Sequence, residues 1–291
     1  MDASTIRKAL SMTEGAYLIP EEIDRAIRDY VSVQPVIYNV INKMPWATPT
    51  YIVRKKTALP TSWWGTDGAN LEAATNSSFA MATLNVKYFY SRGEVTGPMV
   101  RAAGSLYNVL AMDIEDHSRT MVWDLSNAIA TAVGDADDIM GIVHQVTTFT
   151  DFNDVQSIDA ASAYLSTDLL DQLLEEAPTA DTLLCSKATR REIGQILTEK
   201  QRFNDRIEIS AGFKVLSYND VPILVAPEYE DNTEIVAFRR GDAKVLVHED
   251  FNRLELARTK DSTDYLIKGY FGFVLEGRPG RLHDFAFQYT A

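Results

Sequence analysis

Four histidines and one cysteine are the side chains of this sequence best suited to metal binding or nucleophilic catalysis. His117, His144, His248 and His283 lie far apart along the chain, and their spacing suggests no ligand set. His117 falls within an apolar helical stripe, which favours a packed and hydrogen-bonded residue. Cys185 stands in an apolar run before a predicted helix, so we interpret it as a buried small hydrophobe rather than a nucleophile.

The common sequence motifs of catalysis are absent. There is no GxxxxGK[ST] phosphate loop, no GxGxxG fingerprint, no GxSxG elbow and no HExxH pair. Adjacent carboxylates such as Glu175 and Glu176 have no diagnostic value in so acidic a chain. We therefore predict a protein that is not an enzyme, with no catalytic residues, no cofactor and no metal. An α+β enzyme whose site converges only in space stays open as an alternative.

Composition limits the class of protein further. The chain has 291 residues, of which 46% are hydrophobic, enough for a substantial core. It carries 28 Lys and Arg against 41 Asp and Glu, a net charge of -13, which argues against a dedicated nucleic-acid binder, although an acidic total can contain a local basic patch. The single cysteine excludes an intrachain disulfide and fits a reducing compartment. No run of 18 apolar residues occurs, so we predict no membrane span.

The stretch Thr50 to Gly97 predicts two strands around a long loop. "TYIVRK" is rich in β-branched and aromatic residues, and the apolar alternation that starts at Leu84 predicts a strand to Val95. The segment between them, 60–83, is far longer than a hairpin turn and holds Trp63 and Trp64. Loops of this length are usually functional, and tryptophan is enriched at interfaces. We predict contact with a partner; the alternative is that both tryptophans fold back on their own chain.

A long helix and a mixed region follow. Apolar residues at steps of three or four from Leu106 to Val133 predict a helix close to 28 residues long that stops at Gly134. The later segments predict a helix capped by Ser166 or Thr167 and ending at Pro178, a strand 182–185, a Ser186-capped helix, a hairpin turning at Asn219 and Asp220, and a β-rich end. Near the N-terminus, "PEEIDRAIRDY" predicts a short amphipathic helix, packed on its own domain or docked on a neighbour. The fold class is α+β.

Taken in order, these segments resemble the major capsid proteins of tailed double-stranded DNA bacteriophages, the Hong Kong 97-type capsid fold. "TEGAYLIPEEIDRAI" is similar to the start of the family's N-terminal arm, and "YNDVPILVAP" to its turn and apolar strand. "RRGDAKVLVHEDFNRLEL" is similar to its Gly-Asp hairpin, and "YFGFVLEGRPGRLHDFAF" to its closing strands. The order of these motifs, with the long loop and helix between them, carries the resemblance over nearly the whole chain.

The resemblance implies a phage major capsid fold with four parts. These are an N-terminal arm (1–47), an extended β-hairpin loop (48–97), a peripheral domain with a long spine helix (98–140 and 241–275), and an axial domain (141–240 and 276–291). In such families the extended loop lies over a neighbouring subunit. The residues we expect at contacts between subunits are Arg54, Lys55, Lys56, Trp63, Trp64, Leu71 and Phe79 on the loop, and Ile23, Ile27 and Tyr30 on the arm.

By the same resemblance, the chain is expected to assemble with itself into pentamers and hexamers of an icosahedral or prolate head that encloses double-stranded DNA. Only fourteen residues precede Gly15, so we expect assembly with a separate scaffolding protein or with none, unless the chain is already a processed form. A portal and a decoration protein are further expected partners, with non-specific contact to packaged DNA. The location is the virion, after assembly in the host cytoplasm. The alternatives are an encapsulin nanocompartment that encloses protein cargo, and a tail or adaptor protein in a ring.

Overall fold

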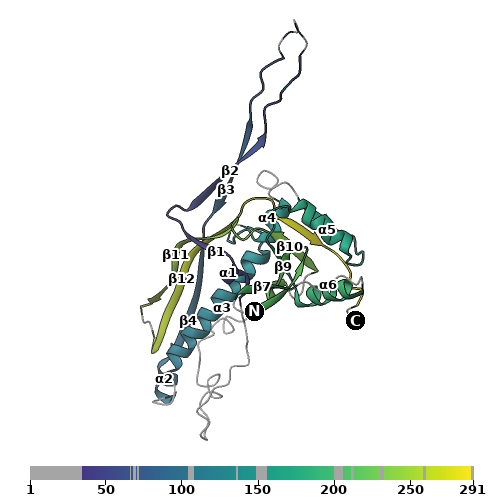
Figure 1. Ribbon diagram of the computed structural model, residues 1–291. Helices are drawn as coiled ribbons and strands as arrows, with labels where there is room; N and C mark the ends of the chain where they lie inside the picture. Colours follow the sequence, from purple (N-terminus) through teal and green to yellow (C-terminus); the bar gives the residue numbers. More distant parts are fainter. Residues whose placement is uncertain are drawn as a thin grey trace.

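Two β-sheets and a projecting two-stranded ribbon organise the chain (Figure 1). The computed structural model describes residues 35–65, 67, 70, 72–103, 108–135, 137–148, 156–199, 206–210, 213–229, 233–257 and 260–289. The predicted helix at "PEEIDRAIRDY" lies outside these residues. Over the described part of the chain, the longer helices cluster between β4 and β7, with β-rich stretches before and after them, so the α+β class is confirmed.

The smaller sheet has four strands among the described residues. In spatial order they are β1 (Asn42–Pro45), β11 (Ala243–Glu255), β12 (Ser262–Leu275) and β4 (Lys87–Thr96). The long β11–β12 pair is antiparallel, and β4 pairs with β12 over ten residues. Helix α3 (Val109–Thr131) runs along one face of this sheet (Figure 1). Its Met121 packs against Tyr265 and Ile267 of β12.

The larger sheet has seven strands in the described part. Their order is β5 (Ser157–Asp159), β13 (Gly280–His283), β10 (Glu234–Phe238), β6 (Thr182–Cys185), β9 (Val221–Val225), β8 (Phe213–Tyr218) and β7 (Arg206–Ser210). Both faces are buried at β10, because Ile235 joins the core beneath α5 (Thr167–Glu176) and α6 (Lys187–Glu199) while Val236 joins the core shared with α3. The core that contains Val236 also contains Phe271 and Phe273 of β12, so this core is shared by the two sheets.

The remaining described elements are short. They are α1 (Ile37–Val40), α2 (Gly97–Ala103), α4 (Ile142–Thr148), the 3-10 turn η3 (Pro227–Tyr229), and the two ribbon strands β2 (Thr50–Ala58) and β3 (Ser78–Asn85). Helix α1 packs on α3, and α4 follows α3 after an acidic turn. The ribbon projects away from both sheets (Figure 1).

Predictions with local signals are confirmed. Ser166 Oγ accepts a hydrogen bond from the Leu169 amide, so Ser166 rather than Thr167 is the cap of α5. Ser186 Oγ accepts a hydrogen bond from the Thr189 amide, as predicted. The strand 182–185 forms as predicted and is buried along its whole length. The β8–β9 hairpin turns at Asn219 and Asp220 with φ of 46° and 64°, the left-handed values that a two-residue hairpin turn requires. Cys185 is completely buried, and that burial raises the pKa of its thiol to about 12.

The long helix is shorter than predicted. It has 23 residues rather than about 28, since Asn108 Oδ1 accepts a hydrogen bond from the Ala111 amide and caps it at this point. It also ends before Gly134: Ala132 is already extended, with ψ of 142°. The physical reason is a β-bridge between Val133 and Met140, which draws the chain out of the helix while the apolar pattern continues.

The predicted strand from Leu84 to Val95 is two strands in two different sheets. β3 pairs with β2, β4 pairs with β12, and Val86 between them donates its amide to Pro49 O at 2.9 Å. The loop is shorter than the predicted 60–83, since β3 already begins at Ser78. Alternation continues through the break because both strands keep a two-residue period, so the sequence pattern does not register the change of hydrogen-bonding partner.

The prediction of a hairpin at the Gly-Asp segment is wrong. The turn closed by the Asp242 amide on Arg239 O at 3.0 Å leads from β10 of the larger sheet to β11 of the smaller one, so it is not a hairpin turn. The long hairpin is instead formed by β11 and β12. The two β-rich runs flanking Gly241 are consecutive in sequence, yet they belong to different sheets.

Two glycines make a matched test of the packing between α3 and the smaller sheet. A Cβ at Gly93 of β4 would lie 2.2 Å from Cζ of Tyr265, whose buried ring is held by a 2.6 Å hydrogen bond from its hydroxyl to Asp113. A Cβ at Gly194 of α6 would find its nearest atom, on Leu216, at 4.0 Å. We expect Gly93→Ala to lower the free energy of unfolding by about 2 kcal/mol through overpacking, and Gly194→Ala to raise it by about 0.5–1 kcal/mol.

Urea unfolding of the unassembled subunit measures both glycine variants. Equal effects of the two substitutions would contradict the close packing of β4 on Tyr265.

Candidate assembly surface

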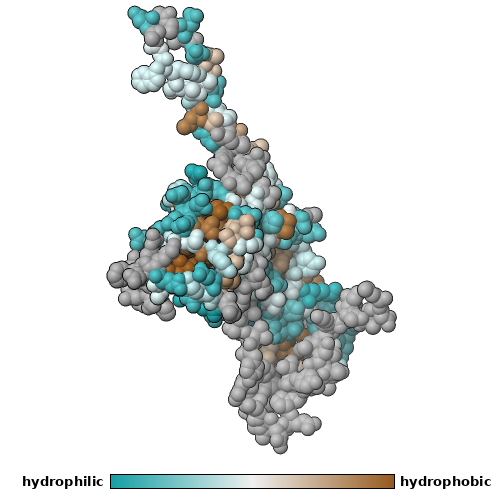
Figure 2. Space-filling view, turned by 90° about the vertical axis from the view of Figure 1, so that its right-hand side faces the viewer, coloured by the Kyte–Doolittle hydropathy of each residue, from teal (hydrophilic) through white to brown (hydrophobic). Residues whose placement is uncertain are grey.

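One face of the ribbon combines apolar and basic side chains in the open. Arg54 lies opposite Met81 and Lys56 lies opposite Phe79, and residues directly opposite in an antiparallel pair share a face. Ile52 is on the same face, two residues from Arg54. The exposed fractions are 50% for Ile52, 62% for Met81 and 72% for Phe79. We call these five residues the docking face; Figure 2 shows hydrophobic surface on the projecting ribbon.

The tryptophans beyond β2 are exposed. The side chain of Trp64 is fully open to solvent, Trp63 is 50% exposed and Leu59 is 74% exposed. The alternative that both tryptophans fold back on their own chain therefore does not describe Trp64. Full burial of one large apolar side chain is worth roughly 1.5–3 kcal/mol, so the ribbon leaves several such contributions unused in the isolated subunit.

The root of the ribbon is firmly packed on the smaller sheet. Ala82 and Leu84 of β3 form a buried cluster with Leu246 of β11 and Val274 of β12. Partly buried side chains surround this cluster: Met44, Trp46, Tyr51 and Val53. The odd-numbered face of β2 thus supplies the root, while the even-numbered face supplies the docking face.

A polar network fastens the same root. The Tyr51 hydroxyl donates to Glu276 Oε1 at 2.7 Å, and Lys244 Nζ donates to Glu276 Oε2 at 2.6 Å. Burial, together with the bond and charge of Glu276, raises the pKa of Tyr51 to about 12, so the phenol stays a neutral donor at any physiological pH. The network ties β2 to β11 and to the residue after β12.

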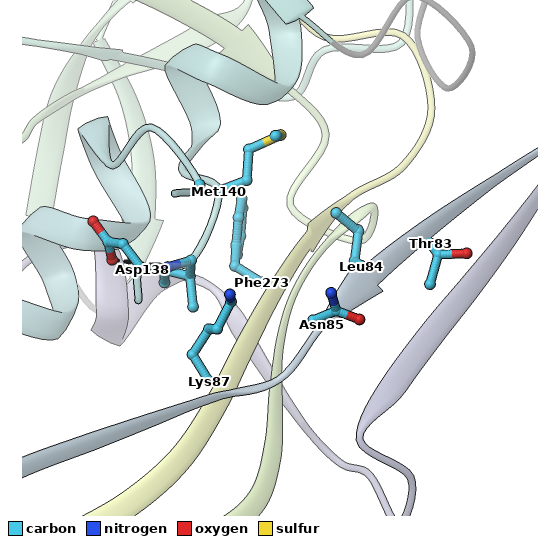
Figure 3. Close-up of a pocket in the computed structure, with 9 residues that line it drawn as sticks. Thr83, Leu84, Asn85, Lys87, Asp138, Met140 and Phe273 are labelled. Atoms are coloured by element: carbon cyan, nitrogen blue, oxygen red, sulfur yellow. Dashed lines mark hydrogen bonds between the residues drawn. The ribbon is translucent and has the colours of Figure 1, made fainter. Parts of the chain in front are cut away.

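A shallow pocket lies where the ribbon meets the body (Figure 3). Leu84, Met140 and Phe273 give it apolar walls, and Asn85 and Asp138 stand at its polar side. Its other lining residues are Thr83, Lys87, Gly134 and Ile139. The pocket therefore combines segments from β3, β12 and the turn after α3.

That turn is strongly acidic. Asp135, Asp137 and Asp138 are all exposed. The Asp138 carboxylate accepts the Ile139 amide at 2.8 Å, and Lys87 Nζ donates to the backbone oxygen of Asp135 at 3.3 Å. The base of the ribbon thus presents negative charge beside the pocket.

A buried carboxylate anchors the chain at residues 36–38, around the start of α1. Oε1 of Glu228 in η3 accepts the Val36 amide at 2.8 Å, the Ile37 amide at 3.1 Å and the Ser126 hydroxyl of α3 at 2.5 Å. The Tyr38 amide in turn donates to Ser126 Oγ at 3.1 Å. Glu228 therefore joins the start of α1, helix α3 and the η3 turn that follows β9.

The predicted contact residues fall into two groups. Arg54, Lys56, Trp63, Trp64 and Phe79 are exposed on the ribbon and its loop. Lys55 is a residue of β2. Leu71 and the arm residues Ile23, Ile27 and Tyr30 lie outside the described residues.

Sequence reasoning missed two parts of this surface. Ile52 and Met81 belong to the docking face, and the signal for them was the strict two-residue spacing from Arg54 and Phe79 once the strands are paired. Glu228 had no local signal, since its backbone partners are about 190 residues away in sequence.

The four histidines do not form one cluster along the described chain. His117, His144, His248 and His283 stand on four different elements: α3, α4, β11 and β13. His117 is partly buried and its Nδ1 lies 2.7 Å from Ser91 Oγ, as expected for a packed, hydrogen-bonded histidine. In the described ranges, no group of three or more His, Cys, Asp or Glu side chains is placed to hold a metal ion, and no helix is long and apolar enough to cross a membrane.

Solved structures with the same architecture are shell proteins. A capsid subunit of cyanophage A-1(L) matches with a TM-score of 0.74 at 10% identity, over 95% of this chain and 99% of that one. A solved structure of Mycobacterium phage Bobi gives a TM-score of 0.66 at 13% identity, over 96% of this chain and 99% of that one. The SrpI encapsulin of Synechococcus elongatus PCC 7942 gives 0.70 at 12% identity, over 95% and 97%. The fold is therefore the Hong Kong 97-type capsid fold.

The amino-acid sequence also identifies the family. A model of the phage capsid family matches residues 15–280, and the chain belongs to this family. A comparison with curated proteins finds no match.

Removing the Glu228 anchor should loosen residues 36–38. In Glu228→Ala, two amides and a hydroxyl lose a buried acceptor, and we expect the free energy of unfolding to fall by about 3 kcal/mol. Glu228→Gln keeps an oxygen acceptor and should lose less. Hydrogen exchange of the amides of residues 36–38 and urea unfolding measure the change, with the exposed Glu175→Ala as the control. Unchanged exchange at these amides in Glu228→Ala would contradict the anchor.

Proposed function

We propose that this chain is the repeating subunit of a phage head shell, assembling with itself into pentamers and hexamers that enclose double-stranded DNA. The observation that carries the proposal is the projecting ribbon, which exposes Ile52, Trp64, Phe79 and Met81 in the isolated subunit. Membership of the phage capsid family supports a structural role. A ribbon that lies over a neighbouring subunit would bury this surface once per subunit around the shell.

The remaining parts of the proposal follow from the same role. We assign the chain four units: an arm (1–47), an extended loop (48–97), a peripheral domain (98–140 and 241–275) and an axial domain (141–240 and 276–291). With these bounds, β1 belongs to the arm and β4 to the extended loop. β1 pairs with β11 and β4 with β12, and both partners belong to the peripheral domain. Contacts between subunits involve the ribbon residues named above and, on the arm, Ile23, Ile27 and Tyr30. The chain carries out no catalysis and needs no cofactor.

The partners and the location belong to the life cycle of a phage head. A separate scaffolding protein guides assembly in the host cytoplasm, a portal occupies one vertex, and a decoration protein is a further candidate on the virion. The net charge of -13 suits a container, because a strongly basic lining would bind nucleic acid indiscriminately. DNA is therefore confined with non-specific contacts rather than read.

An encapsulin-type compartment enclosing protein cargo is the second candidate. The observation that favours it is the match to the SrpI encapsulin, whose TM-score of 0.70 lies within the range of the phage capsids. The two candidates share the subunit fold and differ in what the shell contains.

Assembly of the purified protein tests the proposal. The chain is expressed alone and beside its neighbouring genes, then examined by size-exclusion chromatography and negative-stain electron microscopy. Closed shells, or pentamers and hexamers that close with a scaffold, are the expected result. Nucleic acid inside would identify a phage head and protein cargo an encapsulin. A protein that stays monomeric under every condition, or forms only rings of fixed small copy number, would contradict the proposal.

The tip of the ribbon gives a sharper prediction. Replacing Trp63 and Trp64 by alanine should leave the unfolding of the free subunit within about 0.5 kcal/mol, since both side chains are exposed there. Loss of about 1.4 kcal/mol of contact energy per subunit corresponds to a tenfold weaker association, so we expect at least about tenfold fewer particles. Tyr164→Ala, which removes an exposed aromatic from the body, is the control. Equal particle yields for all three proteins would refute a role for the tip.

A further inference from the structure

A group of buried polar atoms near one edge of the larger sheet has no hydrogen-bond partner within the described part of the chain. These atoms come from four short segments, 156–157, 228–229, 234 and 281. They are Gln156 Nε2 and Oε1, Ser157 Oγ, Glu228 Oε2, Tyr229 OH, Glu234 Oε2 and Arg281 Nε. Buried polar groups in folded proteins are nearly always hydrogen-bonded, because an unpaired one costs its full desolvation free energy. So many unpaired atoms in one region therefore point to a binding partner.

The strand register places three of these side chains on one face of the sheet. Arg281 of β13 lies opposite Ser157 of β5 and opposite Val236 of β10, and residues directly opposite share a face. Glu234 is two residues from Val236, so its side chain lies on the same face. Val236 is buried in the core that also contains Tyr229. The shared face is therefore the one directed toward η3.

The charged groups at this place are only partly used within the protein. Arg281 Nη2 donates to Glu234 Oε1 at 2.5 Å, and this ion pair leaves Arg281 Nε and Glu234 Oε2 unpaired. Glu228 accepts its three hydrogen bonds through Oε1 and leaves Oε2 without a donor. One unpaired donor and two unpaired acceptors thus remain on charged groups.

The Tyr229 hydroxyl lies within reach of all three charges. The residue is completely buried, and that burial raises the pKa of its phenol above the ordinary value. The negative charges of Glu234 and Glu228 raise this pKa further, while the charge of Arg281 opposes them. The phenol therefore stays protonated, and its hydroxyl can donate one hydrogen bond and accept another.

The mixture of donors and acceptors selects the kind of molecule that fits. An anion would meet the carboxylates of Glu228 and Glu234, and a cation would meet the guanidinium of Arg281. Water both donates and accepts, so it can serve carboxylate, guanidinium and hydroxyl groups together. Its small size also suits atoms that are closed off from solvent.

We infer that ordered water molecules bind between η3 and the β5–β13–β10 edge of the larger sheet, bridging the Tyr229 hydroxyl to Glu234 and Arg281. A buried water typically makes about three hydrogen bonds, so more than one molecule is needed to serve all the unpaired atoms. Through Glu228, this internal hydration site adjoins the anchor of residues 36–38. The site belongs to the single subunit, so it does not depend on the proposed shell function.

Removing one hydroxyl tests the inference. If water binds Tyr229 OH, Tyr229→Phe removes hydrogen bonds from a closed network and should raise the equilibrium constant for unfolding about fivefold. A hydroxyl buried without any partner would give the opposite sign, because phenylalanine then removes an uncompensated polar group. Urea unfolding of the unassembled subunit measures the change. The matched control is Tyr164→Phe, which removes the hydroxyl of a tyrosine that is 62% exposed and should alter the constant less than about twofold.

A crystal or electron cryo-microscopy map that resolves ordered water shows the site directly. Water density within hydrogen-bond distance of Tyr229 OH, Glu234 Oε2 and Arg281 Nε, with a destabilised Tyr229→Phe protein, establishes the inference. A Tyr229→Phe protein more stable than the unmodified one overturns it. So does a map in which these three atoms bond only to protein groups, or in which a metal ion or an anion occupies the place.

Discussion

The ribbon is a sheet of only two strands, and it needs another surface to bury its apolar side chains. The rest of this structure depends on that constraint. Isolated pairs of strands are marginally stable in water unless one face packs on something. Here the odd-numbered residues of β2, such as Tyr51 and Val53, pack at the root, while Ile52 and its neighbours on the docking face remain exposed. The ribbon is consequently stable at its base and incomplete beyond it, a division that suits an element meant to be completed by another copy.

The ribbon and residues 36–38 are fastened to the rest of the subunit by different interactions. Leu84, Leu246 and Val274 fasten the ribbon by apolar burial, reinforced by the Tyr51–Glu276–Lys244 network. The chain at Val36 and Ile37 is fastened by the single carboxylate of Glu228, which accepts hydrogen bonds from two backbone amides and a hydroxyl. The Glu228 anchor adjoins the core shared by the two sheets, which contains Ile37 and Tyr229, whereas the root of the ribbon forms a cluster of its own on the smaller sheet.

How far the sequence predicted this structure depends on the range of the signals. The helices capped by Ser166 and Ser186 and the turn at Asn219 were predictable because each signal lies within a few residues of its effect. The break at Val86 was not, because alternation persists while the hydrogen-bonding partner changes from β2 to β12. The full docking face needed the β2–β3 register, and Glu228 needed contacts across about 190 residues. Long-range pairing leaves no local trace.

The central claim is that another copy of the chain covers the exposed side chains of the ribbon. Hydroxyl-radical footprinting with mass spectrometry, applied to free subunits and assembled particles, measures this coverage residue by residue. The account predicts that oxidation of Trp64, Phe79 and Met81 falls several-fold on assembly, as expected when exposed side chains become buried. Oxidation of these three residues at the same rate in subunits and particles would contradict it.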